Sequence, residues 1–413
     1  VGQQIQIFQS TPTTWINGVT SVWAPSKTMP NPDLKWETTV TQNIGLDFAF
    51  FKNRLSGNFD YYINKTSDLL INFPVSGVGY DFQYRNMGET QNTGIEATIN
   101  VVAIEKAKYG LSFSFNMAVN KNRINSLGVM SDFGQGTGWA SSQIGNDYLI
   151  AVGSSLGSMY GYRNDARYEV SDFDYVGGKY VLKSGVVNTS TSLVGDGSSL
   201  KPGDMKLKDI NGDGKVDVND QTVIGNYNPK SSGGFVINGN AYGFDLMAAF
   251  NWSIGNDVYN ADKIEFSTAN ASSEYKNLNS TMADGKRWTN LDPATGQLVT
   301  DNPQALAALN ANTTMWSPYM RSAIFTDWAA EDASFLRLNT LTLGYTTPEM
   351  FTSKLGISKL RFYLTASNVF VWTNYSGSDP EVSTKRKNPL TPGVDSSPYP
   401  RSRQMIFGMN LNF

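Results

Sequence analysis

The stretch that decides the fold lies at the C-terminus and reads QMIFGMNLNF over residues 404–413. Large apolar side chains occupy every second position there, and mostly small polar ones fill the positions between them. The apolar set consists of Met405, Phe407, Met409, Leu411 and Phe413. Because successive side chains of a β-strand point to opposite faces, this period of two predicts a strand with one apolar and one polar face.

The same alternation recurs along the chain and predicts about ten strands. They cover residues 1–8, 36–50, 55–64, 95–101, 111–119, 235–241, 244–252, 335–345, 360–371 and 404–413. One of them sets Leu111, Phe113, Phe115, Met117 and Val119 against Ser112, Ser114 and Asn116. We therefore predict an all-β fold, a transmembrane antiparallel β-barrel whose apolar face contacts membrane lipid and whose polar face lines the lumen.

The connections between these strands alternate in length. Short turns are predicted near residues 51–54, 105–109, 242–243 and 348–358, and long loops over 9–34, 71–90, 123–231, 256–332 and 373–401. Short turns at one end and long extracellular loops at the other are typical of outer-membrane barrels. A pair of soluble β-sandwich domains is the alternative, because their strands also have one polar and one apolar face.

Composition excludes several classes of function. The 413 residues contain no Cys and no His, so neither a thiolate site nor a histidine-based triad or zinc site can form. A net charge of −3 argues against nucleic-acid binding. No apolar run reaches the length of a membrane-spanning helix. A glycosidase needs two carboxylates at a defined distance in space. Acids that are neighbours in sequence, such as Glu331 with Asp332 or Asp379 with Glu381, do not establish that distance, and we expect no enzyme.

The clearest local motif is DINGDGKVDVND at residues 209–220. It places oxygen donors where a calcium loop needs them and Gly at the sixth position, where the chain turns sharply. The predicted ligands are Asp209, Asn211, Asp213, the carbonyl of Lys215, Asp217 and Asp220. A structural calcium ion within the 123–231 loop is therefore predicted, and a polar turn without metal is the alternative.

Several aromatic residues fall in the predicted loops. Flat rings suit stacking on sugars or capture of peptides, although packing within the loops would use the same residues. The candidate ligand contacts are Trp139, Tyr148, Trp288, Trp316 and Tyr319.

Taken together, these segments resemble the barrel of the SusC/RagA family of TonB-dependent outer-membrane transporters. The motifs that carry the resemblance are NPDLKWE at 31–37, NIGLD at 43–47, NRLSG at 53–57, DINGDG at 209–214, FLRL at 335–338, TLGY at 342–345 and SNVF at 367–370. Their order along residues 31–413 is that of the family. The resemblance implies a barrel of about 22 strands, of which residues 1–413 supply the C-terminal portion.

That resemblance also implies a function and a set of partners. We expect active import of an oligosaccharide or peptide across the bacterial outer membrane, together with a SusD-like lipoprotein. The plug domain, the TonB box and the first barrel strands are not found in these 413 residues, so we expect the remainder of the transporter to supply them and to contact TonB. A passive porin and a soluble calcium-stabilised adhesin or scaffold are the alternatives.

Overall fold

A single large sheet dominates the computed structural model, which describes residues 5, 8–16, 19–75, 79–140, 143–269, 277–384 and 388–413. The sheet has ten strands, and all neighbours on its main path are antiparallel. In spatial order the path runs through β27 (Gln404–Asn412), β25 (Lys359–Thr373), β24 (Phe335–Thr346), β19 (Phe244–Ile254), β18 (Ser231–Ala241), β7 (Tyr109–Leu127), β6 (Phe82–Glu105), β5 (Leu55–Pro74) and β4 (Thr38–Phe50). The short strand β3 (Thr28–Met29) pairs with β6 in parallel. The all-β prediction is confirmed.

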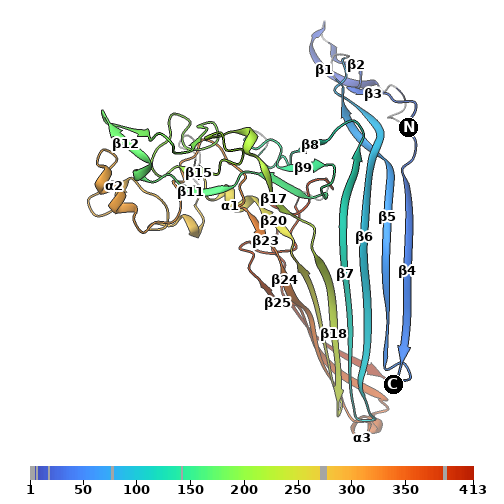
Figure 1. The fold of residues 1–413 in the computed structure, drawn as a ribbon. Helices are drawn as coiled ribbons and strands as arrows, with labels where there is room; N and C mark the ends of the chain where they lie inside the picture. Colours follow the sequence, from blue (N-terminus) through green and yellow to red (C-terminus); the bar gives the residue numbers. More distant parts are fainter. Residues whose placement is uncertain are drawn as a thin grey trace.

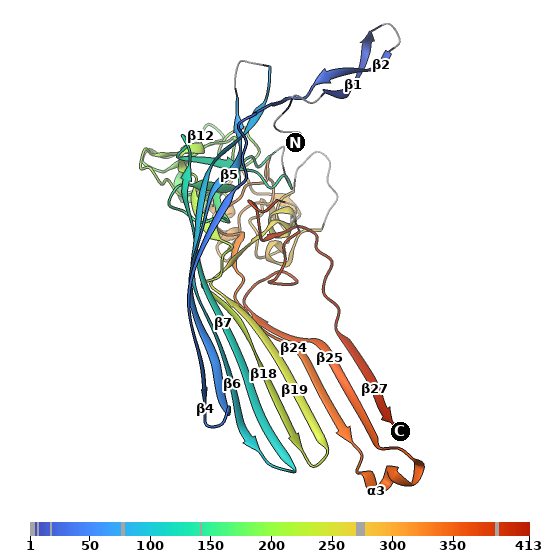
Figure 2. The same ribbon diagram turned by 90° about the vertical axis from the view of Figure 1, so that its right-hand side faces the viewer.

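The sheet is curved, and its two ends differ in the way predicted from loop lengths (Figure 2). Four tight connections lie at one end. Two of them use left-handed backbone: Phe51, Lys52 and Asn53 have φ of 55°, 58° and 66°, and the turn Tyr242–Gly243 has φ of 49° and 92°. Positive φ at both central residues matches the twist of antiparallel hairpin strands. The last connection contains α3 (Glu349–Thr352) and the 3₁₀ turn η4 (Ser353–Leu355).

One predicted loop was wrong, and one predicted strand falls almost wholly outside the described residues. The predicted loop 71–90 is mostly strand, because β5 and β6 stay paired as far as Pro74 and Phe82. Register shifts between Thr66 and Leu70, with Asp68 at φ 60°, interrupt the period of two there. The predicted strand 1–8 lies almost wholly outside the described residues. After it, β1 (Phe8–Ile16) and β2 (Val19–Pro25) pair with each other and project beyond the sheet (Figures 1 and 2).

The strand register places side chains of similar polarity next to one another across the sheet. One row of paired positions on strands β4 to β24 is polar apart from one glycine: Asp47, Asn58, Thr98, Asn116, Gly234, Asn251 and Arg337. The adjacent row is apolar: Phe48, Gly57, Ile99, Phe115, Phe235, Phe250, Leu338 and Phe370. Since neighbouring rows point to opposite faces, the sheet has one continuous polar face and one continuous apolar face.

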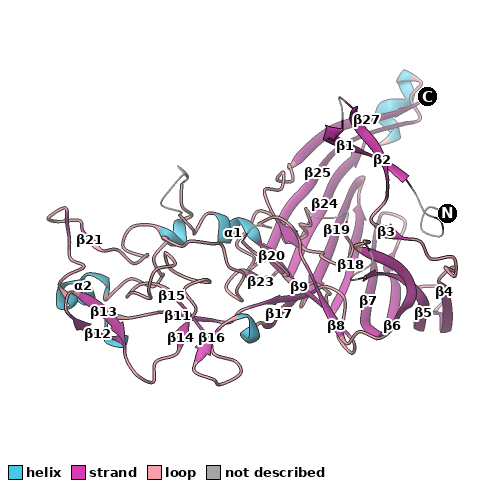
Figure 3. Ribbon diagram, turned by 90° about the horizontal axis from the view of Figure 1, so that it is seen from above, coloured by secondary structure: helices cyan, strands magenta, loops and turns pink. Residues whose placement is uncertain are grey.

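The long loops fold together into a layer at the other end of the sheet (Figures 1 and 3). Its paired strands are β8 (Asp132–Gln135), β9 (Tyr148–Ala151), β10 (Ser158–Gly161) and β17 (Thr222–Asn226); β11 (Asn164–Arg167) with β15 (Met205–Leu207); β12 (Phe173–Val176) with β13 (Lys179–Leu182); β14 (Asn188–Thr189) with β16 (Lys215–Val216); β20 (Asp257–Asn260) with β23 (Ala330–Asp332) and β26 (Val394–Asp395); and β21 (Leu291–Asp292) with β22 (Gln297–Leu298). Its helical turns are η1 (Val170–Asp172), η2 (Val218–Asp220), α1 (Ala261–Glu265), η3 (Ser280–Met282) and α2 (Pro303–Asn310).

Most of the buried side chains lie in this loop layer rather than in the sheet. One apolar cluster joins Tyr148, Tyr259, Phe325 and Val394, which come from three different long loops. Tyr259 and Phe325 stack with ring centroids 3.6 Å apart. The long loops are therefore a packed unit. No helix among the described residues has the length and apolar character needed to cross a membrane.

Candidate functional site

The polar face of the sheet is the one that meets the loop layer. Asn122 of β7 lies on the same face as Asn116, and its Oδ1 accepts a hydrogen bond from the N–H of Leu156 in the loop layer at 2.9 Å. Arg337, at the end of the polar row, is covered by the loop after β25. The opposite face carries exposed rings and aliphatic chains along most of its length. This arrangement makes the polar face the inner wall and the apolar face the outer one.

Four charged side chains fasten the last long loop to this inner wall. Arg337 is 2% exposed, and its Nη2 lies 2.7 Å from Asp379 Oδ1. Arg401 binds Asp379 and also Glu381: its Nε lies 2.8 Å from Asp379 Oδ2, and its Nη1 lies 2.9 Å from Glu381 Oε2. The two positive and two negative charges balance, so the cluster is neutral although half of it is buried. Both carboxylates suggested by sequence as an acidic pair are thus engaged by arginines.

Arg337 and Glu381 are close together but do not form a hydrogen bond. Arg337 Nε lies 2.9 Å from Glu381 Oε2, yet its N–H makes no hydrogen bond among the described residues. The two groups form an ion pair in which the Nε–H is not directed at the carboxylate. Arg337 Nη1 instead donates to Asn368 Oδ1, and Asn368 has a φ of 53° within a bulge of β25.

Two hollows share Glu381 and Arg401 in their walls. One, of about 420 Å³, is lined by hydroxyl residues of the last loop and by Tyr399, which is 95% exposed. The other, of about 280 Å³, reaches the sheet at Asn251, whose buried Oδ1 has no hydrogen-bond partner among the described residues. A buried acceptor without a partner accommodates a donor from water or ligand. The second hollow can therefore hold a hydrogen-bond donor at the inner wall.

A third hollow, of about 290 Å³, lies within the loop layer. Amide, hydroxyl and aromatic side chains line it together with aliphatic ones such as Ile144 and Leu193, and none of its lining residues is charged. Val218 and Gln221 form part of its wall, so the hollow borders the end of the predicted calcium loop. Sequence analysis missed all three hollows. Two of them join segments that are far apart in the chain, and the third forms between residues 379–384 and 396–401 of one loop.

The predicted calcium loop is closed by its own main chain. Asp209 accepts from the N–H groups of Gly214 at 2.7 Å and Gly212 at 2.6 Å, and these bonds hold the pKa of Asp209 below its ordinary value. Asp220 is fully buried, and its carboxylate accepts from the N–H groups of Ile210 and Asp217.

The remaining predicted calcium ligands stay near the surface. Asn211 and Asp213 each accept from the main chain two residues ahead, as Asp217 does from Asn219. Within the described part of the chain, no group of three or more acidic side chains is placed to hold a metal ion. Calcium binding stays a prediction, which depends on Asn211 and the Lys215 carbonyl as well as on the acids.

Burial raises the pKa of several acids in the loop layer, among them Asp147 and Asp204. Desolvation raises the pKa of Asp147 to about 6, although Thr137 donates to its carboxylate from both its N–H and its hydroxyl. Desolvation also raises the pKa of Asp204 to about 7, against a single hydrogen bond from the N–H of Lys201. Both acids lie within the packed interior of the loops, where they stabilise turns.

The candidate aromatic ligand contacts divide by burial. Tyr148, Trp288 and Trp316 are at most 3% exposed, so the prediction that they present their rings to a ligand does not agree with the structure. Tyr148 donates to the carbonyl of Pro392, and Trp316 packs edge-on against Trp328. Trp139 is half-buried and donates to Tyr259 Oη at 2.6 Å. Of the five, Tyr319 alone is largely exposed, at 62%.

Comparison with known proteins places these features in a family. The family described as TonB dependent receptor-like, beta-barrel, matches residues 6–261. TonB-dependent receptor P39 of Formosa agariphila is 31% identical over 406 residues, covering 93% of this chain and 36% of that protein. TonB-dependent receptor SusC of Bacteroides thetaiotaomicron is 28% identical over 93% of this chain and 32% of that protein. The chain thus spans about a third of the length of the curated relatives it matches.

A solved structure has the same fold. The structure titled "Structure of the RagAB peptide transporter" superposes with a TM-score of 0.70 at 23% sequence identity, covering all of this chain and 39% of the matched chain.

Proposed function

The chain belongs to the TonB-dependent receptor β-barrel family, in its SusC/RagA branch, and we propose that it contributes the C-terminal wall and loops of a transporter importing glycans or peptides. As an outer-membrane β-barrel, its sheet has an outer apolar face against lipid and an inner polar face. The observation that carries the proposal is this inner wall, which bears a row of mostly polar side chains and is covered by a packed loop layer whose hollows have both polar and apolar lining residues.

The proposed partners follow from the family. The remainder of the transporter would supply a plug, the other barrel strands and the contact with TonB, which transmits energy from the inner membrane. A SusD-like lipoprotein would cover the extracellular side, where the loop layer lies. The chemistry of the hollows supports a substrate rich in hydroxyl or amide groups, because their walls offer amides, hydroxyls and exposed rings such as Tyr399.

Uptake by living cells tests this function. Cells carrying the full-length protein should take up labelled oligosaccharides or peptides only when TonB is functional. A passive porin would give equal uptake with and without TonB, and an adhesin would give none. Co-purification of a lipoprotein with the tagged full-length protein checks the proposed partner separately.

We also propose that the loop at 209–220 binds one calcium ion that braces the loop layer. The support is chemical: four carboxylates lie within twelve residues at the spacing of a calcium loop. Residues of that loop also border the uncharged hollow, so an ordered loop would keep one wall of that hollow in place.

A further inference from the structure

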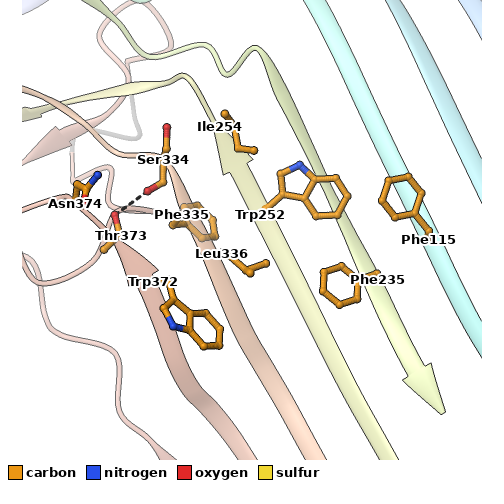
Figure 4. A pocket seen from close by; sticks show the side chains of 10 residues that line it. All are labelled: Phe115, Phe235, Trp252, Ile254, Ser334, Phe335, Leu336, Trp372, Thr373 and Asn374. Carbon is orange, nitrogen blue, oxygen red and sulfur yellow. Dashed lines mark hydrogen bonds between the residues drawn. The ribbon is translucent and has the colours of Figure 1, made fainter. Parts of the chain in front are cut away.

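The outer face of the sheet is hollowed toward the loop-side ends of β18, β19, β24 and β25 and beside the middle of β7 (Figure 4). The groove has a volume of about 590 Å³ and is lined by side chains of β7, β18, β19, β24 and β25. Figure 4 shows Leu336 between two indole rings, those of Trp252 and Trp372. The groove thus has an aliphatic floor and an aromatic wall on each side.

Neighbouring side chains hold both walls in place. The ring of Trp252 stacks on Phe115, with centroids 5.3 Å apart and planes 25° apart. Trp372 packs edge-on against Phe370 at 4.7 Å. Trp252 can lie flat across β18 because Gly233 has no side chain: a Cβ there would stand 2.6 Å from Trp252 Cζ2. The groove is therefore preformed rather than a gap between mobile side chains.

The groove changes from apolar to polar along its length. Leu336 and Trp372 belong to the outer face, and the next positions on that face toward the loops are Ser334 and Asn374. Ser334 is fixed by accepting from the N–H of Gly255 at 2.8 Å, whereas Asn374 is exposed. No charged residue lines the groove. A groove with an apolar floor and one polar, uncharged end complements an amphipathic ligand.

We propose that this groove binds one acyl chain of an outer-leaflet lipid, with the polar head of the lipid beside Ser334 and Asn374. The groove is continuous with the lipid-facing surface of the barrel, so the bilayer already surrounds it. A transported substrate passes on the opposite, polar face. A hydrocarbon chain between the two indole rings would contact protein on its sides and floor, and neighbouring lipid chains on its open side. The contacts with the aromatic walls favour the groove over the flat part of the outer face.

Native mass spectrometry of the full-length protein tests this site, with dipalmitoylphosphatidylethanolamine as the probe. The wild-type protein should retain one lipid in mild detergent. Leu336→Trp fills the floor of the groove and should weaken retention by about tenfold, which corresponds to a loss of about 1.4 kcal/mol. Leu343→Trp is the matched control, because Leu343 lies on the same strand and face but outside the groove. It should retain lipid as the wild type does.

A second variant keeps the test decisive if Leu336→Trp does not fold. Trp372→Ala removes one wall at a residue that is 49% exposed, so folding should tolerate it, and lipid retention should again fall. Equal retention by the wild type, Leu336→Trp and Trp372→Ala would overturn the proposal. So would a photo-crosslinker at position 372 that captures only protein, since the groove would then be a protein interface. TonB-dependent uptake is measured separately, so failure of this site leaves the transport proposal untouched.

Discussion

Arg337 illustrates how one side chain on a barrel strand fixes a loop. Its guanidinium is buried at the end of the polar row and binds Asp379, which Arg401 also binds. Sequence analysis placed Arg337 only within the motif FLRL. Arg337 is the only charged residue of β24, and this signal could have marked it, because an unpaired buried charge is strongly unfavourable. Its acidic partners are some forty residues away, and nothing local identifies them.

Removal of this arginine should loosen the last loop. Arg337→Ala leaves two acids without a buried partner and should lower the free energy of unfolding by about 3–5 kcal/mol. Two measurements on the full-length protein are the readouts. One is the temperature at which the compact form, which migrates faster on a gel than the unfolded form, disappears. The other is the rate of protease cleavage within residues 373–401. Arg361→Ala is the control, since Arg361 pairs with Asp245 on the same face but is more exposed. Its cost should be about 1 kcal/mol or less. Equal costs would contradict a structural role for the cluster.

The orientation of the sheet predicts a difference between two adjacent residues. Phe115 lies on the outer face, stacked on Trp252, and Asn116 lies in the polar row. An Arg at Phe115 faces hydrocarbon and should cost on the order of 2–4 kcal/mol if that position is near the bilayer midplane. Asn116→Arg faces the lumen and should cost far less. Reversible folding of the full-length protein into lipid measures both, and similar costs would reverse or abolish the assignment of faces.

At the scale of elements, strands were predictable and loops were not. The period of two is a local property, so a few residues of β7 or β27 suffice to reveal it. The pattern failed where bulges break it, as around Asp68 in β5. The loop layer depends instead on distant contacts. Tyr148 meets Pro392 across 244 positions, and no local pattern indicates that Tyr148 is buried rather than presented to a ligand.

The 209–220 loop gives a prediction for one element. Asp209→Ala and Asp213→Ala should weaken calcium binding, which for a loop of this kind is expected near 10⁻⁴ to 10⁻³ M. The loop should then be cleaved by protease even with calcium present, as the wild-type loop should be after chelation. Asp292→Ala serves as the control, because Asp292 also accepts main-chain hydrogen bonds in an exposed turn without this motif.

A further variant separates calcium from main-chain bonding. Asp220→Ala removes a buried carboxylate that fixes Ile210 and Asp217, so it should loosen the loop with or without calcium. If chelation leaves the wild-type cleavage pattern unchanged, the loop is a polar turn that its own hydrogen bonds stabilise.

For the whole molecule, the deciding feature is an open sheet. Among the described residues, β4 and β27 are the two edges of the main path, and each pairs along its length with one neighbour. In hydrocarbon an unpaired strand edge leaves N–H and C=O groups without partners, which costs several kcal/mol for each group. The proposed remainder of the transporter would supply further strands that close the barrel.

Residues 1–413 expressed alone should therefore fail to form a stable barrel. Their unheated and heated samples should migrate alike on a gel, whereas the full-length protein should migrate faster before heating because it stays compact. The same tag and membrane preparation make the two samples comparable, and the segment should also be degraded by protease along β4 and β27, the strands with an open edge. A compact, heat-sensitive band from the segment alone would mean that β4 and β27 find partners in another way, such as pairing between two copies of the chain.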